Sequence, residues 1–496
     1  MSPRTIKLGS ATILAAMVFL LPLAGKLSRV QAAPGKDEPA SKQEPATTTE
    51  KDQFDVAVTV YNSNLALVRD SRQIHLPSGS FPLRFEDVAA TINPATVHFR
   101  SLTDAAKLSI LEQNYEYDLL DPQKLLHKYV GHEITISTVN SKGNWEETKA
   151  LLLADNNGAV WKIGDEIVTG IGVSAYHFPE IPGNLYSRPT LVWMLENHGP
   201  ASQKVEASYL ANSVNWNADY VLTVGRDEKK ADLDGWVTLT NNSGAAYKNA
   251  KLQLVAGDVH RLPPGAAGRD YVLAASQAVA VKAAPQFEQE GFGEYHLYTL
   301  ERRTSIENNE SKQISLLTGS GVPVEKFLLV ESDTHYFRNP QGIGNPVKQP
   351  VKVYYRFKND EKSSLGMPLP GGTIRVYQAD SKGGTQFVGE DRIDHTPKDE
   401  KVKVYIGNAF DVVCERKQMD YKKIASNVYE LEYEITLRNH KDTATTVEVR
   451  EPVGGDWEVL KSNYDWTKLD AGSIGFSIPV EKDGTATLTY RVRVKW

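Results

Sequence analysis

Two groups of acidic and histidine residues have spacings that a metal site on β-strands would use. Alternate strand residues project on one face, so carboxylate and imidazole groups from such positions can converge on a cation. The groups are Glu331, Asp333 and His335, and Asp391, Asp394 and His395. The stronger signatures, HExxH, paired cysteines and an Asp-rich calcium loop, do not occur. Surface polar residues are the favoured interpretation, and neither a metal nor another cofactor is predicted.

Nucleophilic catalysis has little support in the sequence. A serine hydrolase needs a G-x-S-x-G turn between a strand and a helix, because that turn exposes the hydroxyl under oxyanion donors. The nearest match, residues 471–475, lacks the first glycine and lies between expected strands. Cys414 is the only cysteine, so no intramolecular disulfide forms, and its strand-like surroundings predict a buried, inert thiol. No catalytic residue is predicted.

Aromatic residues provide the candidate binding site. Trp216 and Tyr220 lie on a segment expected to form a sheet with the segments of Trp193 and Trp236, and Trp usually anchors a sandwich core. If Trp216 and Tyr220 instead face solvent, they form with Asp219 a surface for a sugar ring or a partner strand.

Paired carboxylates for glycoside hydrolysis leave no local spacing to recognise, because they come from distant strands. Asp118, Asp219 and Asp258 are the acids whose convergence with the two aromatic residues in one concave surface would indicate an enzyme or a ligand site. Turn capping is the favoured explanation of all three.

The N-terminus has the pattern of an export signal. Arg4 and Lys7 precede an apolar run, and Val30 and Ala32 supply the small residues that signal peptidase requires, so residues 1–32 are predicted to be cleaved off. The apolar run of about 15 residues is shorter than the roughly 20 that span a bilayer. Lys26 and Arg29 leave an uncleaved anchor open as an alternative.

The mature chain is expected to be soluble, without a transmembrane span, in the periplasm or outside the cell. Residues 1–32 carry four basic residues and no acidic one, so cleavage changes the formal charge from −6 to −10. This acidic balance argues against nucleic acid or anionic lipid as the main partner. Residues 33–53 are rich in Pro, Lys, Glu, Ser and Thr and are predicted to form a disordered polar tether.

Beyond the tether, the chain is predicted to be all-β with few short helices. Its 496 residues exceed the roughly 250 to 300 that one core serves, so several domains are expected. Short alternating segments separated by turn residues predict antiparallel β structure. A single helix is expected at 122–130, with Asp121 as N-cap and Gly131 as its left-handed stop. The predicted domains are an N-terminal β domain with a small barrel-like insertion (54–185) and two immunoglobulin-like antiparallel β-sandwiches (186–345 and 346–496).

A local pattern recurs four times after residue 190: a strand that closes on an apolar residue, any residue and an asparagine, followed by a polar turn. The asparagines are Asn197, Asn241, Asn359 and Asn439. Asparagine suits this position because it tolerates positive φ and its side chain hydrogen-bonds turn backbone. Irregular spacing between the instances indicates a reused hairpin and not a solenoid repeat.

The sequence resembles a bacterial family, domain-of-unknown-function family 4139, which is related to the mucoidy-inhibitor-like proteins. The resemblance covers residues 54 to 260 best, and its most specific segment is Trp216–Tyr220. The other matching segments are Val58–Asp70, Leu111–Leu120, Arg188–Trp193, Gly235–Gly244 and Leu254–Val259. The resemblance implies export and a β-rich fold, and it implies no catalytic residues. The chain lacks the long heptad-patterned insertion of the mucoidy-inhibitor-like members.

These observations predict an exported, non-catalytic envelope protein whose tandem β domains bind an envelope protein or a cell-surface polysaccharide. The alternative is a hydrolase or lyase acting on envelope polysaccharide or peptide. It predicts a deep polar cleft between domains in which two or more carboxylates converge. A third hypothesis is assembly through strand addition at an exposed sheet edge.

Overall fold

The computed structural model describes residues 45–116, 120–140, 142–182, 185–186, 188–257, 259–260, 286–332, 340 and 342–496. The chain divides into two units, Met1–Glu44 and Pro45–Trp496, and every described residue belongs to the second. The expected signal peptide lies outside the described residues, as does the tether up to residue 44. The rest of the expected tether contains strand β1 (Ala46–Thr48) and a 3-10 turn at Glu50–Asp52, so folded sequence begins before Phe54.

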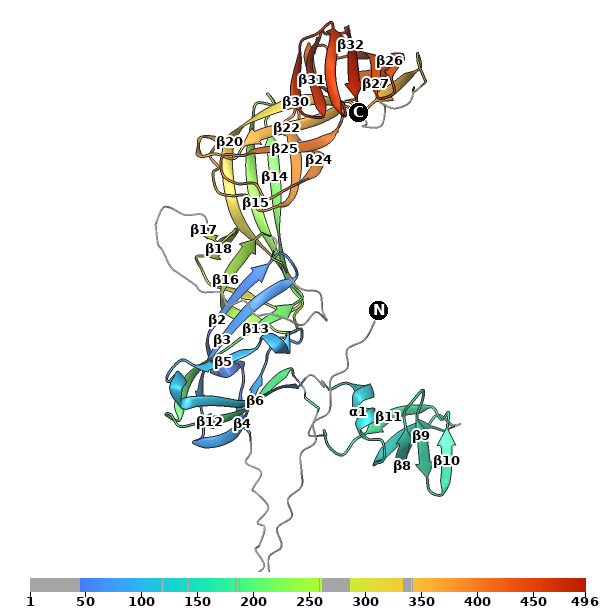
Figure 1. Ribbon diagram of the computed structural model, residues 1–496. Helices are drawn as coiled ribbons and strands as arrows, with labels where there is room; N and C mark the ends of the chain where they lie inside the picture. Colours follow the sequence, from blue (N-terminus) through green and yellow to red (C-terminus); the bar gives the residue numbers. More distant parts are fainter. Residues whose placement is uncertain are drawn as a thin grey trace, which may run out of the picture. The chain divides into compact units, whose positions relative to one another are not determined.

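Two sheets form the N-terminal part of this unit (Figure 1). The smaller has the order β1-β4-β12-β6, from β4 (Gly79–Glu86), β6 (Leu108–Glu116) and β12 (Thr190–Asn197). The larger has the order β17-β18-β16-β2-β3-β13-β5, with β19 paired to β16. Its strands are β2 (Gln53–Tyr61), β3 (Leu65–His75), β5 (His98–Ser101), β13 (Ser202–Asn212), β16 (Tyr247–Ala256), β17 (Phe287–Phe292), β18 (Tyr295–Leu300) and β19 (Thr304–Ile306).

Aromatic residues from both sheets share one core. Phe85 on β4 and Trp193 on β12 are fully buried and meet edge to face, and the ring of Phe99 on β5 lies 4.4 Å from that of Trp193. Strands on both sides of the expected domain boundary at residue 185 therefore contribute to the same sheets and the same core. Short 3-10 turns at Pro94–Thr96 and Ala105–Lys107 flank β5 and β6.

A small insertion between β6 and β12 has its own core. Helix α1 (Pro122–Lys128) lies where the sequence predicted it: the Asp121 carboxylate caps its first amides, and Gly131 adopts positive φ after its end. The sheet order is β10-β9-β8-β7-β11, from β7 (Glu133–Val139), β8 (Trp145–Ala154), β9 (Val160–Ile163), β10 (Glu166–Thr169) and β11 (Val173–His177).

This five-stranded sheet of the insertion curls without closing. Trp161 on β9 and Tyr176 on β11 stack with ring centroids 6.0 Å apart, although two strands separate β9 from β11 in the sheet. Leu126 and Tyr129, from α1 and its C-terminal end, fill the open side of the curl. In place of the expected barrel, the described residues form an open sheet with β10 and β11 as its edges, because these two strands do not pair.

A ten-stranded sheet system follows, with the order β24-β23-β14-β15-β20-β28-β31-β30 and with β22 joining β20 to β25. Strand β20 (Glu310–Glu331) pairs with β15 over its first half and with β22 and β28 over its second half. A 3-10 turn at Glu361–Ser363 follows β22. The other strands are β14 (Val214–Val224), β15 (Lys230–Asn241), β22 (Lys352–Lys358), β23 (Gly372–Ala379), β24 (Thr385–Ile393), β25 (Lys401–Asn408), β28 (Thr445–Pro452), β30 (Trp466–Asp470) and β31 (Ser473–Val480).

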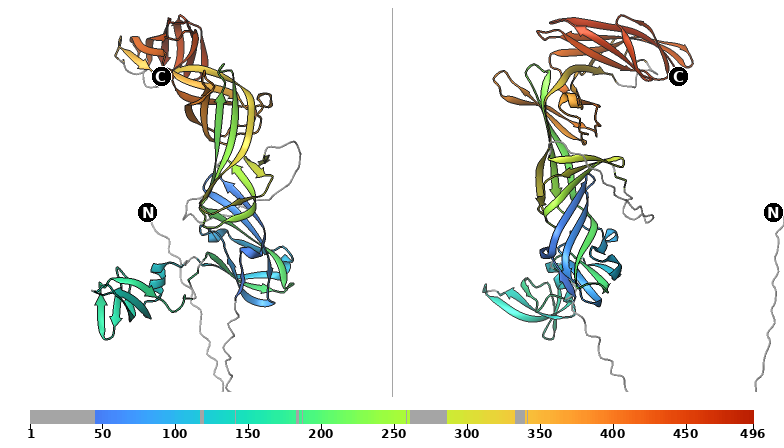
Figure 2. Two further views of the ribbon diagram at one scale, coloured as in Figure 1. Left: turned by 180° about the vertical axis from the view of Figure 1, so that it is seen from behind. Right: turned by 90° about the vertical axis from the view of Figure 1, so that its left-hand side faces the viewer.

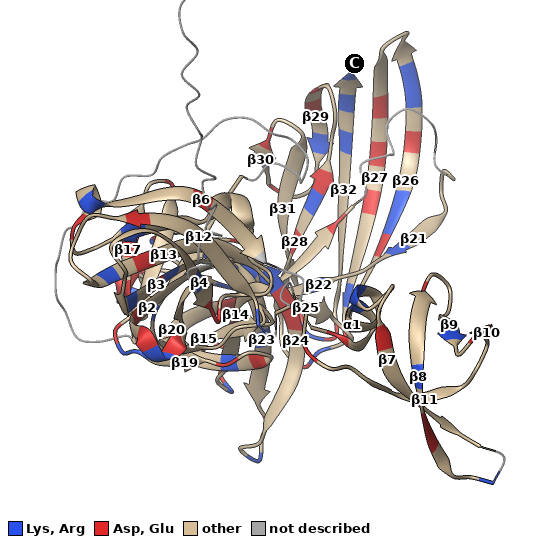
Figure 3. Cartoon of the chain, turned by 90° about the horizontal axis from the view of Figure 1, so that it is seen from below, with Lys and Arg blue, Asp and Glu red and all other residues tan. Residues whose placement is uncertain are grey.

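The last sheet packs against the second half of that system to enclose a separate C-terminal core. Its order is β21-β26-β27-β32-β29, from β21 (Pro346–Gln349), β26 (Val412–Ala425), β27 (Val428–Asn439), β29 (Asp456–Ser462) and β32 (Thr485–Lys495). Strands β26, β27 and β32 run side by side among the orange-to-red strands of Figure 2. In Figure 3 the acidic bands of β27 lie between basic bands on β26 and β32. The three strands form cross-strand ion pairs such as Lys417 with Glu434 and Arg491 with Glu432.

The prediction of an all-β, multi-domain fold is confirmed, and the four asparagines of the recurring pattern explain part of its stability. Each is buried, its side-chain nitrogen contacts three backbone carbonyls, and its side-chain oxygen accepts from a turn amide. None of the four has positive φ, so that part of the rationale is wrong. Their role is to tie the end of one strand to the backbone of neighbouring loops.

In the described part of the chain, no helix combines the length and apolar character that a membrane-spanning helix needs.

Candidate binding site

The three residues predicted to bind do not share a surface. Trp216 and Tyr220 alternate with Asp219 on β14, so they point to the opposite face of the sheet. Trp216 is 1 % exposed and its indole N–H donates to the Val255 carbonyl. Tyr220 is completely buried, its hydroxyl donates to the Pro370 carbonyl, and this burial raises the pKa of its phenol. Both rings belong to a core and are closed to an incoming sugar.

Asp219 is held in a local polar network on the other face. Its carboxylate accepts from the Thr238 hydroxyl at 2.7 Å and pairs with Arg375 at 3.1 Å. Asp118 and Asp258 lie outside the described residues, so convergence of the three acids is not observed.

The second metal-like group is used for backbone hydrogen bonding. The Asp391 carboxylate accepts from the Tyr405 amide at 2.7 Å, and Nδ1 of His395 accepts from the Gly371 amide at 3.0 Å. Asp333 and His335 of the first group lie outside the described residues. No group of three or more His, Cys, Asp or Glu residues suited to a metal ion occurs in the ranges that the structure describes.

Ser473 and Cys414 occupy structural positions. The Ser473 hydroxyl donates to Asp470 at 2.6 Å in the turn between β30 and β31. Cys414 is fully buried in the C-terminal core, and burial raises the pKa of its thiol to about 12. Neither side chain has the environment of a nucleophile.

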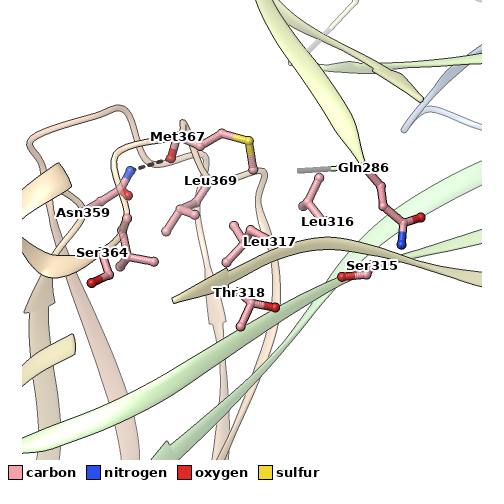
Figure 4. Close-up of a pocket in the computed structure, with 10 residues that line it drawn as sticks. Gln286, Ser315, Leu316, Leu317, Thr318, Asn359, Ser364, Met367 and Leu369 are labelled. Carbon is pink, nitrogen blue, oxygen red and sulfur yellow. Dashed lines mark hydrogen bonds between the residues drawn. The ribbon is translucent and has the colours of Figure 1, made fainter. Parts of the chain in front are cut away.

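A cavity of about 590 Å³ lies beside β20 and the segment after β22 (Figure 4). Leucine and methionine side chains point into its middle, and the Asn359 amide at one end donates to the Met367 carbonyl. Its described lining contains no carboxylate, so it does not supply the acid pair that the hydrolase hypothesis requires. The lining residues are Gln286, Ser315, Leu316, Leu317, Thr318, Asn359, Ser364, Leu365, Met367 and Leu369.

A different surface, on the outer face of β20, β22 and β25, brings together aromatic and basic residues. Phe327, Tyr354 and Tyr405 are direct cross-strand neighbours on these three strands, and we call them the aromatic row. Their ring centroids are 5.2 and 5.3 Å apart. Phe327 is 8 % exposed, whereas Tyr354 and Tyr405 are half-buried. The inward-facing residues between them, such as Tyr355 and Val404, hold the strands on the core.

Four cations lie next to the aromatic row on the same face. Arg356 on β22 lies directly opposite Lys403 on β25, and Lys358 lies directly opposite Lys401. We call these four residues the cation block. Like charges at directly opposed positions destabilise a strand pair. The arrangement therefore concentrates positive charge on a protein whose net charge is −6.

The cation block also contacts the aromatic rings. The Lys403 ammonium lies 4.1 Å from the ring centroid of Tyr354 and 5.5 Å from that of Phe327, and the Arg356 guanidinium lies 4.5 Å above Phe327. Such cation–π contacts explain the low exposure of Phe327. They also hold the basic groups over the aromatic row.

Acidic partners neutralise two members of the cation block and leave the other two without an ion pair. Arg356 pairs with Glu325 at 2.6 Å and with Glu448 at 3.3 Å, and Lys358 pairs with Asp360 at 3.1 Å. Within the described residues, no carboxylate oxygen lies within 4.0 Å of the ammonium groups of Lys401 and Lys403. Burial lowers the pKa of Lys403, while the more distant Glu331 and Glu448 oppose that shift.

This surface could not be predicted from the amino-acid sequence, because its three strands come from separate segments. The only local signals are Tyr354 next to Tyr355 and the alternation of Lys401, Val402 and Lys403. Those signals mark half-buried strands, but they do not say which strands pair. The juxtaposition appears only with the register of β20, β22 and β25.

The part of the chain that forms this surface matches a known family. No curated protein matches the chain. The family model described as Domain of unknown function (DUF4139) matches residues 205–456, which is more than half of the chain and includes the aromatic row and the cation block. The match begins inside the stretch on which the resemblance rested and extends well beyond it. The chain therefore belongs to the DUF4139 family.

Proposed function

We propose that this protein is exported to the cell envelope and acts there as a non-catalytic binding protein for a cell-surface polysaccharide. Export is supported by residues 1–32, whose basic start, apolar run and small residues before the expected cut fit a signal peptide. The expected location is the periplasm or the cell exterior.

The aromatic row carries the binding proposal. Half-buried Tyr354 and Tyr405 present ring surface on an open sheet face, and aromatic rings stack on the apolar faces of sugars while their hydroxyls stay in water. Charged groups around the row, among them Glu325, Arg356 and Lys352, are suited to hydrogen-bond sugar hydroxyls. An open face also accepts a polymer at internal positions, because neither end of the chain must enter a closed pocket.

Affinity gel electrophoresis of the purified exported protein tests the proposal. Soluble polysaccharides in the gel, including neutral dextran and polygalacturonate, should retard the protein, and Tyr354→Ala should weaken the retardation by about tenfold in apparent Kd. Tyr429→Ala is the matched control, because Tyr429 forms a similar ring pair with Tyr421 in the C-terminal sheet, away from the aromatic row. Equal loss in both variants, or no retardation by any polymer, would refute the proposal.

Cell fractionation tests the export half. The mature protein should appear outside the cytoplasm with an N-terminus close to Ala33, as read by Edman sequencing or intact mass. A full-length chain that starts at Met1 and stays in the cytoplasm would contradict it.

A further inference from the structure

We infer that the polysaccharide bound at the aromatic row carries carboxylates, as uronic acid units do, and that Lys403 is the residue that recognises them. This inference rests on the proposed function and names its ligand class. The strand register supplies the first argument: Lys403 opposes Arg356 and Lys401 opposes Lys358 on one face. Acids compensate one member of each pair, Arg356 and Lys358, so an anion bound beside β25 would compensate the other two members, Lys401 and Lys403.

The distribution of ion pairs supplies the second argument. The acids of this face are already engaged: Glu325 and Glu448 pair with Arg356, and Glu331 pairs with Lys352. Lys403 is exposed, and its ammonium has no carboxylate within 4.0 Å among the described residues. An ammonium whose contacts are aromatic rings remains available for a carboxylate, because a charge-assisted hydrogen bond to an anion is stronger than a cation–π contact at an exposed site.

The position of Lys403 relative to the rings supplies the third argument. Its ammonium lies 4.1 Å from the Tyr354 ring centroid, at the border between the aromatic row and the cation block. In a uronic acid, the carboxylate projects from the rim of the sugar ring. A sugar stacked on Tyr354 or Tyr405 thus places its carboxylate within reach of Lys403, whose long stem lets the ammonium move from the ring onto the anion.

Polygalacturonate, its methyl ester and dextran distinguish this inference from the proposed function. For the unmodified protein, polygalacturonate should bind about tenfold more tightly than the methyl ester, and the advantage should shrink between 50 mM and 500 mM NaCl because salt screens ion pairs. Lys403→Met keeps the length of the stem and removes the charge. It should abolish the preference for polygalacturonate over the methyl ester.

Lys468→Met is the matched control, because the Lys468 ammonium also lies over an aromatic ring, 4.8 Å from that of Trp457, outside the binding face. It should leave polygalacturonate binding unchanged, and thermal unfolding should confirm that both variants fold. If all three polymers bind equally well and Tyr354→Ala weakens the binding of each, the inference about carboxylates is wrong and the proposed function stands. Binding of none overturns both. Stronger binding of inorganic polyphosphate than of polygalacturonate overturns the uronate assignment.

Discussion

Glu451 is the most deeply embedded charged residue of the C-terminal core. It is completely buried and accepts hydrogen bonds from the Arg416 guanidinium at 2.8 Å and from the Tyr490 hydroxyl at 2.6 Å. The Arg416 guanidinium lies 3.8 Å from the Tyr433 ring centroid. Desolvation lowers the pKa of Arg416, but the charge and hydrogen bond of Glu451, together with Tyr490 and Tyr433, raise that pKa above its usual value. The ion pair is satisfied on both sides, which is the condition under which a buried pair is tolerated.

Glu451→Ala should lower the free energy of unfolding by about 3 to 5 kcal/mol, because it leaves the Arg416 charge buried without its acid. Urea denaturation followed by tryptophan fluorescence measures the change. Glu458→Ala is the control, because the Glu458 side chain is 70 % exposed and its ion pair with Arg493 is long, at 3.9 Å. This substitution should lower the free energy of unfolding by less than about 1 kcal/mol. Similar losses in the two variants would show that the buried network does not stabilise the core.

Cys414 should be unreactive in the folded protein. A thiol whose pKa is raised to about 12 by burial exists as thiolate in only about one molecule in ten thousand at pH 8. A thiol reagent such as DTNB should therefore report no fast-reacting cysteine in buffer and one cysteine in 6 M guanidinium chloride. Rapid labelling of the folded protein at pH 8 would contradict the burial of this side chain.

The buried asparagines act on whole strands because each ties a strand end to a neighbouring loop. Asn241, at the end of β15, contacts the Ala245, Ile306 and Glu307 carbonyls and accepts from the Ser243 amide. These contacts join the end of β15 to the segment before β16 and to the end of β19. The same arrangement at Asn197, Asn359 and Asn439 makes it a general device of this fold.

Asn241→Ala should destabilise the protein by about 3 kcal/mol, because buried carbonyls and an amide lose their partners. Asn241→Asp should cost at least as much, since a carboxylate opposes carbonyls that need a donor. The control is Asn217→Ala on the adjacent strand β14, where the side chain is exposed. Differential scanning calorimetry compares the variants, and equal Tm values for Asn241→Ala and Asn217→Ala would refute the role.

The elements could be predicted from the sequence to the extent that their signals are local. Period-two alternation predicts strands, and Asp121 with Gly131 predicts the ends of α1, because each signal concerns neighbouring residues. Alternation also implied that Asp219 and Tyr220 lie on opposite faces of one strand, and grouping them in one site disregarded this. Which strands pair is set by distant segments, so the aromatic row and the cation block could not be predicted.

At the scale of the whole molecule, the insertion between β6 and β12 is connected in a way that allows its removal from the rest of the protein. Its flanking strands are direct neighbours: Glu116 at the end of β6 is the cross-strand partner of Thr190 at the start of β12. The residues between them include a separate core built around Trp161. A two-residue turn is sufficient to connect paired antiparallel strands.

Replacing residues 117–189 with Asn-Gly should leave the rest of the protein folded, with a Tm within about 5 °C of the parent. The lost surface ion pair between Arg188 and Asp87 is expected to cost little. Circular dichroism and size-exclusion chromatography test this outcome. The control is a shorter deletion, of residues 117–154. It removes α1, β7 and β8 and leaves β9, β10 and β11 without their neighbouring strands, so this variant should aggregate. Unfolding of the Asn-Gly variant would show that the insertion is needed for the fold.

Strand β20 contributes to two cores, and the spacing of its buried residues limits the insertions and deletions that it tolerates. Its inward residues Ile314, Leu316, Val322 and Val324 belong to the core shared with the N-terminal sheets, and Leu328 and Val330 belong to the C-terminal core. The pairing of β20 with β22 is regular from Val324 to Leu329, so loss of one residue between Val324 and Leu328 would turn one of the two sets toward solvent. Over evolutionary time, loops elsewhere are free to lengthen or shorten by any number. In this part of β20, by contrast, we expect related chains to differ in length only by an even number of residues, so that both sets of buried residues keep facing their cores.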